Sequence, residues 1–180
     1  MLQGKMMERP LSVAAILDYA SDVHGTARIL SRRVEGDLHS QDFATTRLRV
    51  KRLANALIDL GVRPGDRVAT LAWNGYRHLE LYYAVSGIGA VCHTINPRLF
   101  DEQIVYIANH AEDRVLFYDR AFAPLVERLK PQFTSIEHYV CFDPAAGDPG
   151  FESLIAVEDG HYRWVEGDER DPCMLCYTSG

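Results

Sequence analysis

Helix-like and strand-like segments alternate along most of this 180-residue chain, and the alternation restricts the folds open to it. In the helix-like segments apolar residues recur at i, i+3 and i+4, whereas the segments between them are short, continuous apolar runs rich in Val, Ile and aromatic residues. Such runs are typical of strands buried on both faces. Because alternating strands and helices build a parallel sheet with right-handed crossovers, we expect a layered α/β fold with a mainly parallel sheet flanked by helices.

The first 42 residues follow a different pattern. A short strand over 27–31 and the polar turn Glu35-Gly36-Asp37 predict an antiparallel hairpin that returns through His39. Further along, Asp42 and Gly61 are a candidate N-cap and C-cap for the clearest helix. The expected helices are 12–20, 42–61, 76–87, 101–111, 121–129 and 151–157; the expected strands of the sheet are 67–73, 90–95, 114–118 and 136–142, followed by an acidic loop over 166–172 and a terminal strand. The helical stripes are Val13, Ile16, Leu17 and Ala20 in the first helix and Val50, Leu53, Leu57 and Leu60 in the second.

Composition excludes several classes of protein. The formal net charge of −6 argues against a general nucleic-acid binder, whose affinity depends on basic side chains. The chain has no apolar run close to the roughly 20 residues of a membrane span. The first ten residues, MLQGKMMERP, lack the apolar core of a secretory signal, so we expect a cytoplasmic location.

Four cysteines occur, and the last two, Cys173 and Cys176, have the C-x-x-C spacing of zinc and redox sites. In a strand, residues three apart point to opposite faces, which does not favour joint binding of one ion. Met174 and Leu175 between them are expected in the core. We therefore predict buried free thiols and no metal site.

Four cations, Arg47, Arg49, Lys51 and Arg52, lie on the helix over 42–61. They could form a basic binding patch or the solvated face of a helix whose other face is buried. The apolar stripe on the same helix favours the solvated face.

Strand ends are the other candidate sites, because open α/β sheets bind ligands beyond the carboxyl ends of their strands. His93 and Asn96 lie at one such end and the stretch Trp73-Asn74-Gly75 at another. We interpret His93 and Asn96 as structural residues that pin a loop in which Pro97 fixes the turn, and 73–75 as a packing and turning element. The histidines form no zincin-like pair and no serine lies in a nucleophile elbow, so no catalytic acid or base is visible.

The final stretch, CMLCYTSG, has an apolar run that leads into Thr178-Ser179-Gly180. Hydroxyls and the backbone N–H groups of a glycine-containing loop after a buried strand suit phosphate oxygens. Many turns also contain serine and glycine, so these residues alone leave both a turn and a phosphate site open.

Three longer runs resemble a known family. They are NGYRHLELYYA (74–84), GAVCHTINPRLF (89–100) and YIANHAED (106–113). Together with the terminal stretch they are similar to the amino-terminal region of acyl-CoA synthetases of the adenylate-forming superfamily, over about residues 45–180. The resemblance is greatest to medium- and long-chain fatty-acid–CoA ligases and to 3-methylmercaptopropionate–CoA ligases. One departure is Asp42-Phe43-Ala44-Thr45, where relatives commonly have Thr-aromatic-x-Glu.

The resemblance implies an activity and its cofactors. Members of the superfamily use ATP and Mg²⁺ to convert a carboxylic acid into an acyl-adenylate, which coenzyme A then converts into a thioester. Thr178, Ser179 and Gly180 would open the ATP phosphate loop, which continues Thr-Thr-Gly-x-Pro-Lys-Gly in relatives. No catalytic residue and no metal ligand carries over to this chain. The expected substrate is a medium- or long-chain fatty acid, with 3-methylmercaptopropionate as the alternative.

The resemblance also implies that residues 1–180 are an incomplete amino-terminal domain that ends inside the phosphate loop. Alone, they would be catalytically inactive. A different class of function stays open, in which the chain is a non-catalytic interaction or dimerisation module, and a homodimer is compatible with both hypotheses.

Overall fold

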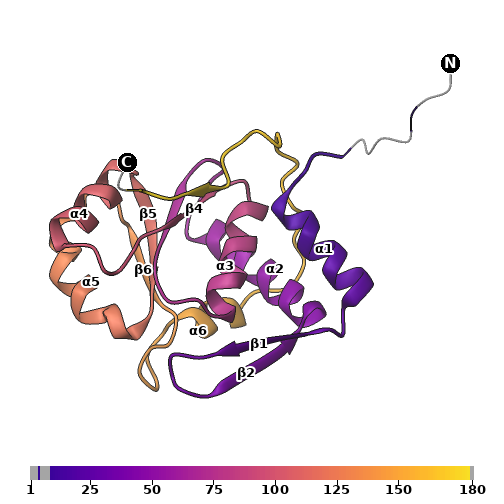
Figure 1. Cartoon of the computed structure of the whole chain (residues 1–180), viewed down its shortest axis with the longest axis horizontal. Coiled ribbons are helices and arrows are strands. Elements are labelled where there is room, and N and C mark those ends of the chain that lie inside the picture. Colours follow the sequence, from indigo (N-terminus) through magenta and orange to yellow (C-terminus); the bar gives the residue numbers. More distant parts are fainter. Residues whose placement is uncertain (1–3, 5–8, 179–180) are drawn as a thin grey trace.

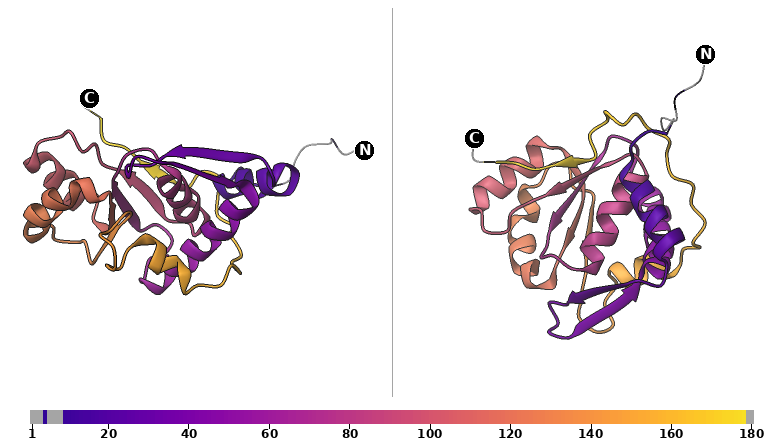
Figure 2. Two further views of the ribbon diagram at one scale, coloured as in Figure 1. Left: turned by 90° about the horizontal axis from the view of Figure 1, so that it is seen from below. Right: turned by 45° about the vertical axis from the view of Figure 1, so that its right-hand side comes forward.

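Residue 4 and residues 9–178 are described by the computed structural model, and they form layers around a central sheet (Figure 1). Helices α4 and α5 cover one face of the sheet, and α2 and α3 cover the other, with α1 and α6 packed beside them (Figures 1 and 2). The elements are α1 (Val13–His24), β1 (Arg28–Arg32), β2 (Leu38–Asp42), α2 (Phe43–Asp59), β3 (Arg67–Leu71), α3 (Tyr76–Gly87), β4 (Val91–Thr94), α4 (Asp101–His110), β5 (Asp113–Tyr118), η1 (Arg120–Phe122), α5 (Ala123–Leu129), η2 (Lys130–Gln132), β6 (His138–Cys141), α6 (Phe151–Ala156) and β7 (Met174–Leu175), where η marks a 3-10 turn. The expected α/β class is confirmed.

The five-stranded sheet has the order β6-β5-β3-β4-β7, and every neighbouring pair is parallel. β3 is central: β4 lies on one side of it, and the chain then crosses back to place β5 on the other side. This reversal is a topological switch point, and ligands of open α/β sheets bind beyond the carboxyl ends of the strands at such points.

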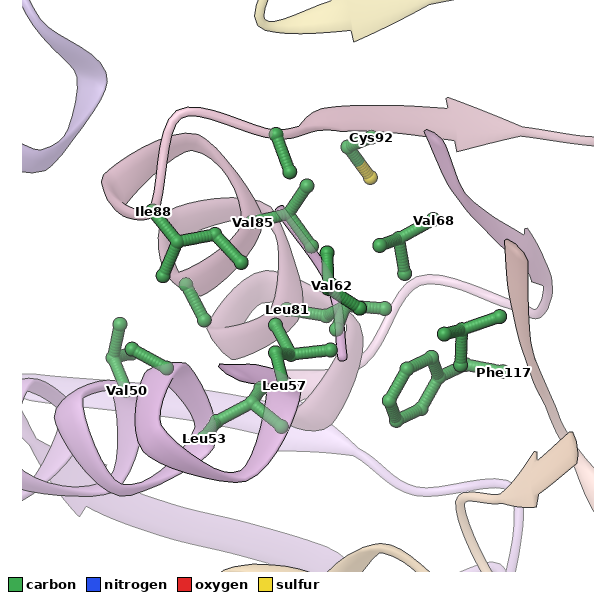
Figure 3. Packing of buried hydrophobic residues seen from close by; sticks show 14 of the residues in the cluster. Val50, Leu53, Leu57, Val62, Val68, Leu81, Val85, Ile88, Cys92 and Phe117 are labelled. Carbon is green, nitrogen blue, oxygen red and sulfur yellow. The ribbon is translucent and has the colours of Figure 1, made fainter. Parts of the chain in front are cut away.

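Two cores explain why the central strands bury apolar side chains on both faces of the sheet. Val68 of β3 and Phe117 of β5 pack toward α2 and α3, whereas their neighbours Ala69 and Leu116 pack toward α4 and α5. Figure 3 shows the first core, in which Leu53 and Leu57 of α2 meet side chains of α3 and of the sheet. Among the described residues no helix is both long and apolar enough to cross a membrane.

The amino-terminal hairpin and the start of α2 follow the sequence predictions. β1 and β2 pair antiparallel, with Leu30 opposite Ser40, and form a separate two-stranded sheet. The Asp42 carboxylate accepts a hydrogen bond from the Thr45 backbone N–H at 2.8 Å, which confirms it as the N-cap of α2. Gly61, just beyond the end of that helix, has a φ of +83°, a left-handed conformation that glycine adopts without strain.

The predicted apolar stripe of α1 is wrong at Ile16, which is 61% exposed. The buried residues of this helix are Ala14, Leu17 and Ser21, which share the face through which α1 packs against α2 and α3. The helix also continues four residues beyond the expected end at Ala20, to His24.

The solvated-face interpretation of the α2 cations is wrong for Arg49. Its guanidinium contacts the fully buried carboxylate of Glu80 at 2.7 Å and that of Glu152 at 2.9 Å. Gln41 also donates to Glu80 Oε1 at 2.7 Å. Glu80 lies on α3 and Glu152 on α6, so Arg49 joins these two helices to α2, and Gln41 of β2 is linked to Arg49 through Glu80.

Burial of the cysteines is confirmed only for Cys92. All four are free thiols, but Cys173 and Cys141 are partly exposed and Cys176 is exposed. Met174, expected in the core, is 49% exposed. In the described residues β7 pairs with β4 alone, so one edge of this short strand has no neighbouring strand to cover it. Within 9–178 no group of three or more His, Cys, Asp or Glu residues could hold a metal ion.

Candidate functional site

The carboxyl ends of β3, β4 and β7 meet at one edge of the sheet, as parallel pairing requires. Between these ends and helices α3 and α4 lies a cavity of about 800 Å³. Its lining comes from five segments: Ala72, Trp73 and Asn74 after β3; Thr94, Ile95, Asn96, Pro97 and Leu99 at the end of β4; His78 and Tyr82 on α3; Glu102, Gln103, Tyr106 and Ile107 on α4; and Cys176, Tyr177 and Thr178 after β7. The structure thus brings together at least one residue of each strand-end motif that the sequence indicated, namely Trp73 and Asn74, Asn96, and Thr178.

The loop after β3 is held by a buried carboxylate. Trp73 N–H donates to Asp119 Oδ2 at 2.6 Å, and Asp119, which follows β5, is only 5% exposed. Burial raises the pKa of Asp119 to about 6; the Trp73 N–H opposes this rise, and the nearby Asp143 carboxylate adds to it. The stretch 73–75 therefore turns the chain as predicted, whereas Trp73 packs only in part and is 42% exposed beside the cavity.

His78 of α3 contributes an aromatic wall to the cavity. Its Nδ1 donates to the Trp73 carbonyl at 3.2 Å, and its ring stacks on Tyr82 with 5.0 Å between centroids. Burial lowers the pKa of His78, which favours the neutral ring. A neutral, stacked imidazole suits a packing role at this wall.

The loop after β4 is pinned by Asn96, as predicted: its side-chain oxygen accepts a hydrogen bond from the backbone N–H of Arg98 at 3.0 Å. His93 is structural, but it does not hold this loop. Its Nδ1 lies 2.8 and 2.9 Å from the two carboxylate oxygens of Asp113, at the start of β5, and both side chains are fully buried. Burial raises the pKa of Asp113, and the hydrogen bond from His93 opposes that rise.

Thr178 lies at the cavity, directly after Tyr177. Ser179 and Gly180, the other two residues of the predicted phosphate site, lie outside the described residues. Tyr177 packs against the core under α4, and its hydroxyl is 2.6 Å from Nδ1 of His110. The terminal apolar run therefore delivers a hydroxyl side chain to the switch point of the sheet.

Charge limits what this part of the site can do. Among the described lining residues Glu102 is the one formally charged side chain, and neither Lys nor Arg contributes. Arg98 lies near the cavity, with its guanidinium 5.9 Å from the Trp73 ring centroid. The described lining residues therefore offer hydroxyl, amide and aromatic groups to a ligand, and no cation.

Comparison with known proteins assigns this arrangement to a family. The sequence profile described as "AMP-binding enzyme" matches residues 19–180, which is most of the chain. The chain belongs to the AMP-binding enzyme family.

Curated relatives within this family carry the names of CoA ligases. The chain is 48% identical to a 3-methylmercaptopropionyl-CoA ligase of Ruegeria pomeroyi and 41% identical to a medium-chain-fatty-acid–CoA ligase of Ectopseudomonas oleovorans, in both cases over 98% of the chain and 34% of the relative. It is 41% identical to a long-chain-fatty-acid–CoA ligase of Thermus thermophilus, over 97% of the chain and 32% of the relative. The chain thus spans about a third of the length of these relatives.

Solved structures agree with the fold. The chain superposes on the anthranilate CoA ligase AuaEII, determined with anthranoyl-AMP, with a TM-score of 0.86 at 23% identity, over 99% of the chain and 34% of that structure. It superposes on the N-terminal domain of FACL13 from Mycobacterium tuberculosis with a TM-score of 0.79 at 23% identity, over 94% of the chain and 41% of that domain. At this identity the likeness shows that the family fold is present.

Sequence reasoning missed several residues of the cavity. His78, Tyr82 and Tyr106 were not identified as site residues, although all three are helical residues. Their helical spacing indicated which helices they belong to but not that α3 and α4 flank the same strand ends. Only the strand order places these two helices on either side of the cavity.

Proposed function

We propose that this chain is the amino-terminal part of an ATP-dependent carboxylic acid–CoA ligase. The observation that carries the proposal is the position of Thr178 at the carboxyl-edge cavity in a chain of the AMP-binding enzyme family. The names of relatives that are 41–48% identical over nearly the whole chain support the same reaction class. Residues 1–180 then form an incomplete amino-terminal domain and make no thioester by themselves.

In this proposal Thr178, Ser179 and Gly180 form the first part of the ATP phosphate loop. The acid's carboxylate attacks the α-phosphorus of ATP and expels pyrophosphate; the thiol of coenzyme A then attacks the acyl carbon and expels AMP. Mg²⁺ supplies positive charge to the phosphates. The described lining fits this division of roles, since it has hydroxyl and amide groups for orientation but neither Lys nor Arg for neutralisation.

The chain's own residues have supporting tasks. Trp73, held through its N–H by Asp119, and Asn96, which turns the loop after β4, shape the cavity next to Thr178. His78, stacked on Tyr82, and Tyr106 present aromatic surface that keeps water away from part of the cavity. These residues position and shield, and no described residue is assigned a proton transfer.

For the acid we propose a medium- or long-chain fatty acid, with 3-methylmercaptopropionate as the second candidate. The two fatty-acid ligases named above favour the first. The second is favoured by the higher identities, 48% and 45%, to two Ruegeria ligases for 3-methylmercaptopropionate. We further propose that the protein acts in the cytoplasm.

The test is thioester formation by the longer protein that contains this chain. With ATP, Mg²⁺ and coenzyme A, we expect acid-dependent release of AMP and pyrophosphate, compared across octanoate, palmitate and 3-methylmercaptopropionate. Residues 1–180 assayed alongside are expected to release neither. Failure of the longer protein with all three acids, or turnover by residues 1–180 alone, would overturn the proposal.

A further inference from the structure

Tyr177 lies between β7 and Thr178, and its side chain is held by two histidines from other elements. Its hydroxyl is 2.6 Å from Nδ1 of His110, the last residue of α4. Its ring meets the His110 ring edge-on at 5.9 Å between centroids, and it lies tilted against the His93 ring at 5.2 Å. Burial raises the pKa of Tyr177, which keeps the phenol protonated near neutral pH and able to donate.

Both histidines have further contacts, although His93 is buried and His110 is exposed. His93 is fully buried in β4 and donates through Nδ1 to the fully buried Asp113. Its other nitrogen, Nε2, is buried without a hydrogen-bond partner among the described residues, so the bond to Asp113 orients the ring. His110 stacks on Tyr106 of the same helix, with 5.4 Å between centroids and an interplanar angle of 18°. Tyr177 therefore rests on rings that the sheet and α4 hold in place.

This support matters because β7 is too short to set the direction of the chain beyond it. Its ladder to β4 consists of two pairs, Cys92 with Met174 and His93 with Leu175, extended by a hydrogen bond from Cys92 N–H to the Cys173 carbonyl. Two pairs fix the position of the strand but leave the residues after Leu175 free to diverge. The first firm side-chain anchor after the ladder is Tyr177, one residue before Thr178.

We propose that Tyr177 is a positioning residue for ATP binding: held by His110 and by the Asp113–His93 pair, it fixes where the phosphate loop starts. This rests on the proposed function, since it assigns Thr178 to that loop. A loop held in advance binds its ligand without having to be ordered at that moment, and the benefit appears in ATP affinity.

The test is the dissociation constant of MgATP, measured by titration calorimetry on the longer protein, because ATP binding does not require the identity of the acid. Tyr177→Phe keeps the ring and removes the hydroxyl; we expect binding to weaken about fivefold, the size of one hydrogen bond. His110→Ala should weaken binding by a similar or larger factor. The double variant should be no weaker than His110→Ala alone, because both changes remove the same hydrogen bond.

Matched controls separate positioning from general loss of structure. Tyr139→Phe removes the hydroxyl of another partly buried tyrosine that packs on the same core but lies on β6, and it should bind MgATP like the wild type. If His110→Ala does not fold, His110→Gln keeps a hydrogen-bonding group for the Tyr177 hydroxyl and should bind within about twofold of the wild type.

The outcomes distinguish this inference from the proposal on which it rests. A wild-type protein that does not bind MgATP overturns the proposed function and this inference with it. A wild-type protein that binds MgATP, together with a folded Tyr177→Phe variant of equal affinity, overturns the positioning role alone. Additive losses in the double variant would also contradict it, because they would mean that Tyr177 and His110 act separately.

Discussion

At the scale of single residues, the charges buried between α2, α3 and α6 have the largest consequences for stability. Glu80 is fully buried and Arg49 is mostly buried, whereas Glu152 is nearly half exposed. Burial raises the pKa of Glu80 despite the opposing Arg49, while that of Glu152 falls to about 2 because its hydrogen bonds to Arg49, Arg77 and Tyr76 outweigh its desolvation. The ion pair with Arg49 therefore offsets much of the free energy that burial of the Glu80 carboxylate costs.

Removal of this cation alone should be strongly destabilising. Arg49→Met leaves the buried Glu80 carboxylate with Gln41 as its remaining donor, and we expect a loss of about 3 kcal/mol in the free energy of unfolding. Arg47→Met, which breaks more exposed pairs with Asp22 and Asp18, is the matched control and should cost at most about 1 kcal/mol. Urea denaturation of both variants measures the difference. Equal losses would contradict the account of Arg49 as an interior residue.

Asp119 predicts a pH dependence of stability. Its pKa is about 6 in the folded protein and 3.8 ordinarily, so the folded state binds its proton more tightly than the unfolded chain does. Stability therefore falls as pH rises from about 4 to about 6, by on the order of 2 kcal/mol. The Asp119→Asn variant has no carboxyl group to titrate at this position. Its free energy of unfolding relative to the wild type should therefore increase by about 2 kcal/mol between pH 4 and pH 7.

The measurement is urea denaturation of the Asp119→Asn variant and the wild type at several pH values. Asp148→Asn, in the exposed loop before α6, serves as a control for the loss of one surface carboxylate. A stability difference between Asp119→Asn and the wild type that does not change between pH 4 and pH 7 would show that the folded pKa of Asp119 is close to its ordinary value.

At the scale of elements, the sequence predicted helix and strand positions well because period and capping are local properties. α3 was expected over 76–87 and occurs at those residues, and Asp42 caps α2. The errors concern partners that are distant in the sequence. The exposed position of Ile16 depends on which face of α1 meets α2 and α3, and Arg49 finds carboxylates 31 and 103 residues away. No local pattern carries that information.

The same reasoning applies to the candidate site. Thr178 could be placed at a strand end from the sequence, because an apolar run followed by hydroxyls and glycine is a local signal. The exposure of Met174 and Cys176 could not be predicted from the sequence. It arises because β7 has one neighbouring strand in the described part of the sheet. The contact between Tyr177 and His110 spans 67 residues and requires the strand order.

One element-scale contact can be tested at Gly87, the last residue of α3. Trp164 lies so close that a Cβ at this position would be 2.5 Å from its ring, and Val165 N–H donates to the Gly87 carbonyl at 2.9 Å. Gly87→Ala, a favourable change in an open helix, should here displace Trp164 and destabilise the fold by about 1–3 kcal/mol.

Tryptophan fluorescence in a Trp73→Phe background reports this displacement, because Trp164 is then the remaining tryptophan. We expect a red-shifted emission maximum for Gly87→Ala, along with weaker binding of the 157–173 segment to α3. Unchanged emission and unchanged stability would indicate that the segment does not pack against Gly87 in solution.

At the scale of the whole molecule, self-association stays a prediction. Ile16, Tyr19 and Val23 form an exposed apolar stripe on α1, and each is more than half exposed. If this stripe pairs two copies, sedimentation velocity should show a mass that rises with concentration, and Tyr19→Lys should shift the protein toward monomer. A single monomeric species at all concentrations would contradict the homodimer.

We propose that this chain is the amino-terminal third of a CoA ligase whose ATP phosphate loop begins at Thr178. The most direct measurement is the coding sequence that follows the codon for Gly180. We expect an open reading frame about three times as long as this chain, in line with the relatives, that continues Thr-Thr-Gly-x-Pro-Lys-Gly. A stop codon at that position, with no continuation, would contradict the claim and favour the interaction module.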